Sequence, residues 1–316
     1  MISRRLLRIK TLQVLFAFFR AENHSLSKAE SELLHSIKKG YDLYHLLFLL
    51  LLEIRDFAQR RIETAKQKLI PTHEDLNPNT RFVENPLLTV IGQNESILRY
   101  TAQNKLGWVN YPELVKKLYQ KITASEYFTK YMEAETVDFT QHRQVLVNIL
   151  SKELIDFDDF TNCLEEQSIY WNDDLDFMIG MATKSIKGFE PDQQTDVPVF
   201  SMYKSDDDED FAKRLLRKVV LNHSHNSQMI DNFTKNWDVE RIASMDNLIL
   251  EMAITEIIEF PSVPVKVSFN EYIEISKYYS TDQSSTFING VLDKIILTLR
   301  SEGKIQKQGR GLVGEE

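Results

Sequence analysis

The chain has 316 residues, a formal net charge of −9, and only 10 glycines and 8 prolines. Strand-rich sandwiches and barrels need frequent Gly and Pro turns, so this composition favours an all-α protein. Hydrophobic residues make up 42% of the chain, which excludes wholesale disorder. A single cysteine, Cys163, excludes an internal disulfide and a cysteine-based zinc site, and we expect it to be a small buried residue.

The charge is unevenly distributed along the sequence. Residues 1–20 contain no acid and hold the basic residues Arg4, Arg5, Arg8, Lys10 and Arg20. Residues 300–310 are also basic, whereas the rest of the chain is acidic. A basic end on an acidic body indicates a local surface for a polyanion.

No segment has the pattern of a targeting signal or a membrane span. The apolar run 14–19 is too short for a signal-peptide core. The run 46–52 is also short, because a membrane-spanning helix needs about 20 apolar residues. We therefore expect no membrane partner and a cytoplasmic protein.

The first predicted helix covers residues 4–22 and is apolar around most of its circumference, which is typical of a buried helix. A narrow stripe of Lys10, Gln13, Ala17 and Arg20 interrupts this apolar surface. Positive charge in the first turns opposes the helix dipole, which favours a role for the arginines outside stability. The alternative is a solvated, frayed helix start.

The central part of the chain shows helical periodicity broken by two loops. Residues 25–70 predict a short helix followed by a long one, and the proline-containing stretch 71–86 predicts a loop. The stretch 189–205 has two prolines and few apolar residues, which is typical of a linker. Between the loop and the linker, helices are predicted at 87–106, 112–134, 139–168 and 175–187.

The last third of the chain predicts a second set of helices. Its acidic start, 206–210, favours a helix N-terminus through the helix dipole. The residues from 301 to 316 are polar and Gly-rich, and we expect a disordered tail there. The predicted helices are 211–235, 238–259, 268–279 and 283–300.

Nothing in the sequence supports catalysis or metal binding. Gly309–Gly314 has the spacing G-x-G-x-x-G, but a dinucleotide site needs a preceding strand and a following helix. His223 and His225 are two residues apart, so they face different sides of a helix and cannot share a metal. We therefore expect no catalytic residue, no metal and no cofactor.

Three blocks stand out at residues 236–242, 264–277 and 282–294. Core packing explains their apolar positions, but it explains the pairs Asn270-Glu271 and Asn289-Gly290 poorly. Gly290 within a helix costs about 1 kcal/mol relative to alanine, so a packing or contact reason is expected. Asp282 is placed to cap the last helix.

These blocks resemble the motifs W-x-x-E-R-[IL], P-x-x-V-x-x-x-N-E-x-[IV]-E-x-[AS]-K and S-x-x-[FY]-[IV]-N-G-V-L-D-K of the bacterial NusB transcription antitermination family, in the same order. Residues 4–16 look like the basic first helix of that family. The resemblance implies an all-α fold of two small helical bundles. It also implies a large helical insertion, because ordinary members have only a short stretch after the first helix.

The expected organisation follows from this resemblance. Residues 1–24 form the basic first helix, and 25–205 form the insertion, with its linker at about 189–205. Residues 206–300 complete the NusB-like core, and 301–316 form the tail. Because the insertion is acidic, we expect it to cover the core or dock a further protein rather than to bind RNA.

The resemblance further implies binding to boxA-type RNA in rRNA transcripts, together with the ribosomal protein NusE, within the transcription elongation complex. Asp282–Ser284 lie where the last helix begins, near the RNA surface of the family, and Phe16 takes a position usually filled by Tyr. The implied partner-binding residues are Glu240 and Asp246. The implied RNA-binding residues are Arg4, Arg5, Arg8, Lys10, Gln13, Phe16, Asp282, Gln283 and Ser284.

Two other classes of function stay open from the sequence. An rRNA cytosine methyltransferase can carry a NusB-like domain, but it needs a cofactor loop and catalytic cysteines, and Cys163 precedes the NusB-like region. A protein-interaction scaffold that does not bind RNA would leave the basic first helix merely solvated. Loss of RNA binding with rising salt would separate an RNA-binding protein from such a scaffold.

Overall fold

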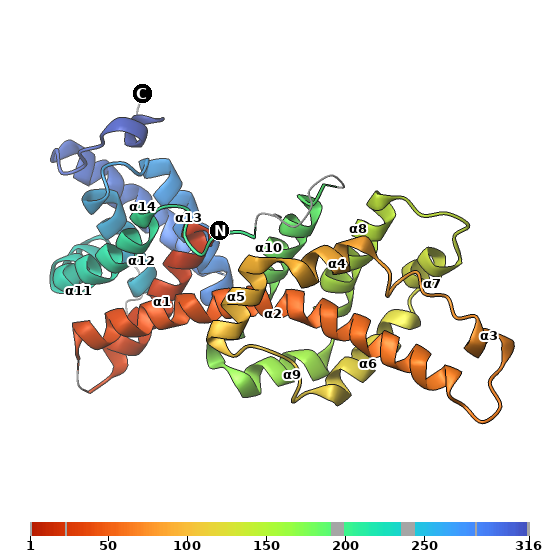
Figure 1. Ribbon diagram of the computed structural model, residues 1–316. Coiled ribbons are helices and arrows are strands. Elements are labelled where there is room, and N and C mark those ends of the chain that lie inside the picture. The colour runs from red at the N-terminus through yellow and green to blue at the C-terminus, as the bar shows by residue number, and fades with distance from the viewer. Residues whose placement is uncertain (1, 23, 191–198, 235–243, 282, 315–316) are drawn as a thin grey trace. The chain divides into compact units, whose positions relative to one another are not determined.

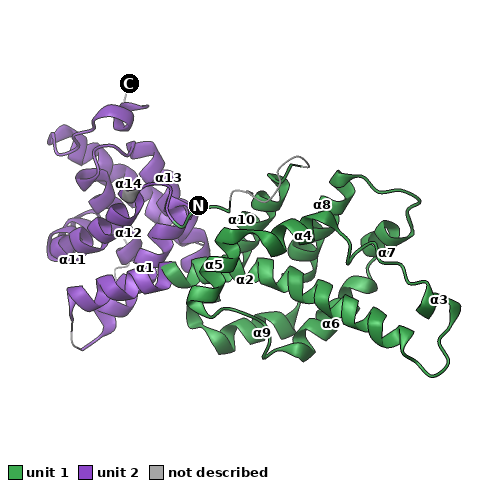
Figure 2. Ribbon diagram, in the orientation of Figure 1, with its two compact units in different colours: residues 1, 38–202 green, residues 2–37, 203–316 purple. Residues whose placement is uncertain are grey.

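The computed structural model describes residues 2–22, 24–190, 199–234, 244–281 and 283–314 (Figure 1). Every regular element within these ranges is helical, which confirms the all-α prediction. The chain divides into two compact units, one of residues 38–202 and one of residues 2–37 and 203–316 (Figure 2). None of the described helices combines the length and apolar character needed to cross a membrane.

Unit 2, which comprises residues 2–37 and 203–316, joins the N-terminal helix to the last third of the chain. Helix α1 packs on α11 and α12, and α12, α13 and α14 pack on one another. The apolar side chains Leu7, Leu12 and Leu15 of α1 are buried at this junction. The helices of this unit are α1 (Arg4–Arg20), α11 (Asp206–Thr234), α12 (Ser244–Glu259), α13 (Val265–Tyr279) and α14 (Ser284–Ser301), together with the first part of α2 (Leu26–Lys66).

Unit 1, which comprises residues 38–202, is built around the rest of α2. The indole N–H groups of Trp108 and Trp171 donate to the α2 carbonyls of Leu46 and Lys39, at 2.8 and 2.7 Å. A Cβ at Gly40 of α2 would lie 2.8 Å from Met178 Cε, so the glycine permits close packing. The other helices are α3 (His73–Leu76), α4 (Pro86–Gln93), α5 (Glu95–Asn104), α6 (Pro112–Thr123), α7 (Glu126–Glu133), α8 (Phe139–Asn148), a π-helical turn (Ile149–Glu153), α9 (Asp158–Gln167), a 3₁₀ turn (Ile169–Trp171) and α10 (Leu175–Lys187).

Several predicted boundaries were wrong. Residues 26–66 form one helix rather than two, and the boundary between the two compact units falls inside this helix, at residue 38. The three segments predicted at 87–106, 112–134 and 139–168 are each divided. At Asn94 the reason is visible, because its side chain accepts from Ile97 N and so ends α4 and begins α5. Helix α10 and buried Cys163 agree with the predictions.

The C-terminal segment is ordered by contacts with the loop between α12 and α13, contrary to the predicted disordered tail. Lys307 Nζ donates to the carbonyls of Ile257 and Phe260 at 2.7 and 3.1 Å, and Gln308 N donates to Pro261 O at 2.9 Å. Gly311 is buried, and a Cβ there would lie 1.9 Å from Pro261 O. Gly311 of the G-x-G-x-x-G pattern therefore serves this close backbone approach.

We expect Gly311→Ala to release this segment from the bundle, because the added methyl group has no room beside the Pro261 carbonyl. Trypsin should then cleave after Lys307 and Arg310 at least about tenfold faster, which corresponds to about 1.4 kcal/mol of lost docking free energy. Gly290→Ala is the matched control, since nothing lies within 4 Å of a Cβ at that position. Equal cleavage rates in the wild type and the Gly311 variant would contradict the docking.

Candidate nucleic-acid interface

Arg8, the innermost arginine of α1, is buried in an ion pair. Its Nε and Nη2 atoms donate to Oε2 and Oε1 of Glu256 on α12 at 2.8 and 2.6 Å. Ser268 Oγ and Tyr272 OH of α13 donate to the same carboxylate at 2.7 and 2.9 Å. The side chains of Arg8 and Glu256 are 3% and 0% exposed. Arg8 therefore links α1 to α12 and α13.

The pKa values in this cluster follow from burial and charge. Burial lowers the pKa of Arg8, but the charge of Glu256 and its hydrogen bonds more than offset this effect and leave that pKa above its ordinary value. Burial, followed by the charge of Glu256, raises the pKa of the Tyr272 hydroxyl well above its usual range. Tyr272 thus stays protonated and can donate to the carboxylate.

Arg4 and Arg5 lie nearer the surface than Arg8, and each has an acidic partner. Arg5 donates to both carboxylate oxygens of Glu271 at 2.8 and 2.9 Å, and this hydrogen bonding raises the pKa of Arg5. Arg4 Nε donates to Asp208 at 3.0 Å, and its guanidinium lies over the Phe211 ring. Both side chains are about half exposed, so a ligand can reach them.

The structure corrects the expected accessibility of two RNA-binding candidates on α1. Arg8 and Lys10 are 2% and 1% exposed, so both residues are buried. Gln13 is half-buried, and its amide donates to Tyr279 OH at 3.3 Å. Phe16 is also half-buried and lies under the Arg20 guanidinium. The exposed part of the predicted basic surface is thus Arg4, Arg5 and Arg20.

The RNA-binding candidates at the start of α14 also differ in their exposure. Gln283 is exposed, whereas Ser284 is buried and donates to Asp246 Oδ2 at 2.8 Å. Asp282, which was predicted to cap this helix, lies outside the described residues. The contribution of this helix start to RNA binding stays a prediction.

Asp246, a candidate for partner binding, is buried, and its carboxylate is hydrogen-bonded within unit 2. Its two carboxylate oxygens accept from Ser280 Oγ and Ser284 Oγ, so it joins the start of α12 to the turn between α13 and α14. Only 5% of Asp246 is exposed, so its carboxylate lies in the interior rather than on the surface, and its contact with a partner stays a prediction. Glu240, the other candidate, lies outside the described residues.

The two asparagines that core packing explained poorly are both on the surface. Asn270 of α13 and Asn289 of α14 are exposed, whereas Ile288 and Val291 of α14 are buried. Among the described residues, no atom outside the helix's own nearby backbone and the adjacent residues lies within 4 Å of a Cβ built at the neighbouring Gly290. The surface around Asn289 and Gly290 is thus open to a partner.

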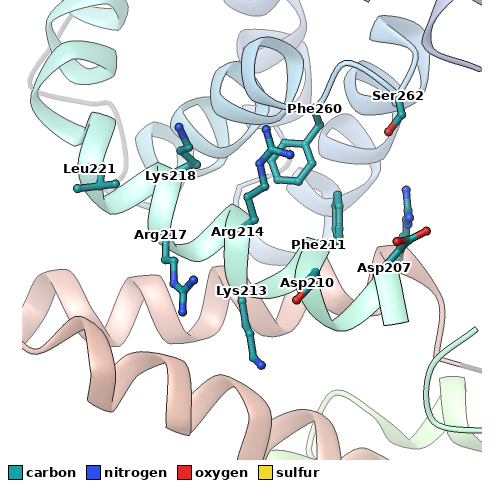
Figure 3. A pocket seen from close by; sticks show the side chains of 11 residues that line it. Asp207, Asp210, Phe211, Lys213, Arg214, Arg217, Lys218, Leu221, Phe260 and Ser262 are labelled. Atoms are coloured by element: carbon teal, nitrogen blue, oxygen red, sulfur yellow. The ribbon is translucent and has the colours of Figure 1, made fainter. Parts of the chain in front are cut away.

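A basic surface on α11 was missed by the sequence analysis. It forms a hollow of about 670 Å³ in unit 2 (Figure 3), which we call the α11 basic hollow. The signal was obscured because the acidic run 206–210 immediately precedes it. The spacing of Lys213, Arg214, Arg217 and Lys218 on one helix could have revealed it. The lining residues are Arg4, Asp207, Asp210, Phe211, Lys213, Arg214, Arg217, Lys218, Leu221, Phe260 and Ser262.

Comparison with known proteins supports the resemblance read from the motifs. The NusB family model matches residues 190–297. Three similar proteins are each named transcription antitermination protein NusB: those of Salinibacter ruber (46% identical over 105 residues), Chloroherpeton thalassium (41% over 104) and Natranaerobius thermophilus (40% over 85). No solved structure matches the chain.

The matches cover only part of each protein. They include 33%, 33% and 27% of this chain and span 66%, 49% and 61% of the lengths of those three relatives. The matched residues supply α11, α12, α13 and most of α14, which belong to unit 2 together with α1. The inserted unit lies almost entirely outside the family match. This chain therefore carries a NusB-family domain over residues 190–297.

Proposed function

We propose that this protein is a non-catalytic, RNA-binding transcription antitermination factor. It would act on boxA-type RNA of rRNA transcripts together with a NusE-type ribosomal protein, within the transcription elongation complex. The observation that carries this proposal is the NusB-family match over residues 190–297, shared with relatives named for transcription antitermination.

The geometry of unit 2 supports the same function. Although more than 180 residues separate them in sequence, α1 and α11 pack together, so the basic first helix joins the family domain. Exposed Arg4 and Arg5 and the cations of α11 are available to phosphate groups. Exposed Asn289, with half-buried Gly290 beside it, offers a separate surface for a protein partner.

The test is RNA binding by the full chain, measured by fluorescence anisotropy with and without the purified NusE-type protein. We expect boxA-type RNA to bind more tightly than a scrambled RNA of equal length, and the protein partner to increase this affinity. Equal, weak affinity for both RNAs in the presence of the partner would contradict the proposal. Partner binding without any RNA binding would favour the scaffold.

Arg4→Ala combined with Arg5→Ala is expected to weaken RNA binding through lost phosphate contacts. Two contacts to a single strand correspond to a decrease of about 1.4 in the slope of log affinity against log salt. Arg60→Ala with Arg61→Ala is the matched control, because both arginines are exposed on α2 in the inserted unit. An unchanged slope in the Arg4 and Arg5 variant would remove these residues from the RNA site. Arg8 is unsuitable for this experiment because it is buried.

A further inference from the structure

The α11 basic hollow concentrates positive charge on one face of one helix. Lys213, Arg214, Arg217 and Lys218 follow the spacing i, i+1, i+4, i+5, which places them on adjacent turns of the same face. The opposite face carries Ala212, Leu215, Leu216 and Val219, all of which are buried in the bundle. The basic residues are thus held toward solvent by a fixed helix.

The stability of the fold does not explain this cluster of four cations on α11. Like charges four residues apart on a helix repel one another and destabilise it. Nearby acids offset this repulsion, since Lys213 pairs with Glu209, Arg217 with Glu30, and Lys218 with Glu259 at 2.9 Å. Such exposed ion pairs contribute little to stability, so a more highly charged anionic ligand can compete with the acids.

The arginines also retain donors for a ligand. A guanidinium has five N–H groups. Arg217 uses its Nε and Nη2 atoms on Glu30, and Arg214 uses Nη2 on the carbonyl of Glu259. Both side chains are slightly more than half exposed. Their other N–H groups can bind phosphate while the existing hydrogen bonds hold the side chains in place.

The side chains that line the hollow indicate which part of an RNA it can bind. Phe211 and Phe260 are both buried, and arginine guanidiniums lie 4.9 and 4.8 Å from their ring centroids. The rings are therefore not available to stack with bases. In Figure 3, Lys213 and Arg217 extend on one side of α11 and Arg214 and Lys218 on the other, where Arg214 lies over the Phe260 ring. This arrangement offers several point charges and guanidinium groups along a helix, which suits successive phosphates.

We propose that the α11 basic hollow binds the phosphate backbone of single-stranded RNA and supplies sequence-independent affinity. This inference rests on the proposed function and extends its RNA site from α1 to α11. Arg4 belongs to both regions, because it lines the hollow and lies on α1. Base recognition is assigned elsewhere, since the hollow presents no exposed aromatic face.

The test is the full-length variant Arg214→Gln, Arg217→Gln, Lys218→Gln. Binding is measured by anisotropy, over a range of salt, with fluorescein-labelled boxA-type RNA and a uridine oligonucleotide of equal length. Losing three contacts should lower the log–log salt slope by about 2 and weaken binding of both RNAs about 100-fold near 0.1 M salt. The control Lys116→Gln, Lys117→Gln, Lys130→Gln removes the same charge from exposed positions of the inserted unit and should change affinity less than about twofold.

A second measurement uses the wild-type chain and is independent of the folding of the variant. Bound RNA should protect Lys213 and Lys218, but not Lys116, from acetylation by a small amine reagent. If RNA binds but the α11 variant keeps the wild-type slope and Lys218 is not protected, the inference is wrong while the proposed function stands. If the wild-type chain binds neither RNA, both fail. Loss of protein-partner binding alone, with RNA binding intact, would assign the hollow to a protein and overturn the inference.

Discussion

Replacing Arg8 with alanine should lower the free energy of unfolding of unit 2 by about 3–5 kcal/mol, because removing one member of a buried ion pair leaves the other charge uncompensated. Glu256 would keep the hydrogen bonds from Ser268 and Tyr272 but lose both bonds from the guanidinium. The loss is measured by urea unfolding followed through far-ultraviolet circular dichroism. Since α1 is joined to α12 and α13 through this pair, the release of α1 is the expected structural consequence.

Arg5→Ala is the matched control for this substitution. Arg5 also forms a paired hydrogen bond with a glutamate, but its side chain is 47% exposed, and exposed pairs contribute about 0–1 kcal/mol. Arg8→Met combined with Glu256→Leu removes both charges and should recover much of the lost stability. Equal destabilisation by Arg5→Ala and Arg8→Ala would show that burial does not distinguish the two arginines.

Asp246→Lys should also destabilise unit 2 by about 3–5 kcal/mol, because it exchanges a hydrogen-bonded buried carboxylate for an uncompensated buried cation. The carboxylate accepts from Ser280 and Ser284, which fixes the turn before α14. The expected result is a lower urea midpoint with an unchanged dependence on urea concentration. Any loss of affinity for a NusE-type protein should then accompany the unfolding rather than occur in the folded variant.

Asp246→Asn is the control, because the amide oxygen can still accept one hydroxyl hydrogen bond. It should lose less stability than Asp246→Lys. A stable, folded Asp246→Lys variant that no longer binds the NusE-type protein would show instead that this acid contacts the partner, as the family resemblance had implied. Normal stability and normal partner binding would contradict both roles.

The basic residues of α1 and α11 show how charge patterns in a sequence can mislead. The five basic residues of the first twenty indicated a surface for a polyanion, yet Arg8 and Lys10 are buried. The partner of Arg8 lies 248 residues away, at Glu256. A local count of charge contains no information about such a distant carboxylate. The α11 cations were missed for the opposite reason, because acidic neighbours in the sequence masked a basic face.

The sequence by itself determined the helical class, most of the helices, and the family of the C-terminal region. Helical periodicity and motif spacing are local properties. The motif at 264–277 falls on α13 and the residue before it, and the motif at 282–294 falls on α14 and the residues just before it. Local capping also fixes some boundaries, as at Asn94, although the apolar pattern continues across that residue.

Only the tertiary structure decided which charged side chains remain on the surface. Packing of α1 on α11 and α12 buries Arg8 beside Glu256, while Arg4 and Arg5 stay partly exposed. Packing likewise turns Asp246 inward toward Ser280 and Ser284, and it orders the Gly-rich segment against Pro261. The physical reason is that desolvation, ion pairing and close backbone approach depend on residues brought together in space, and long-range contacts of this kind leave no periodic signal in the chain.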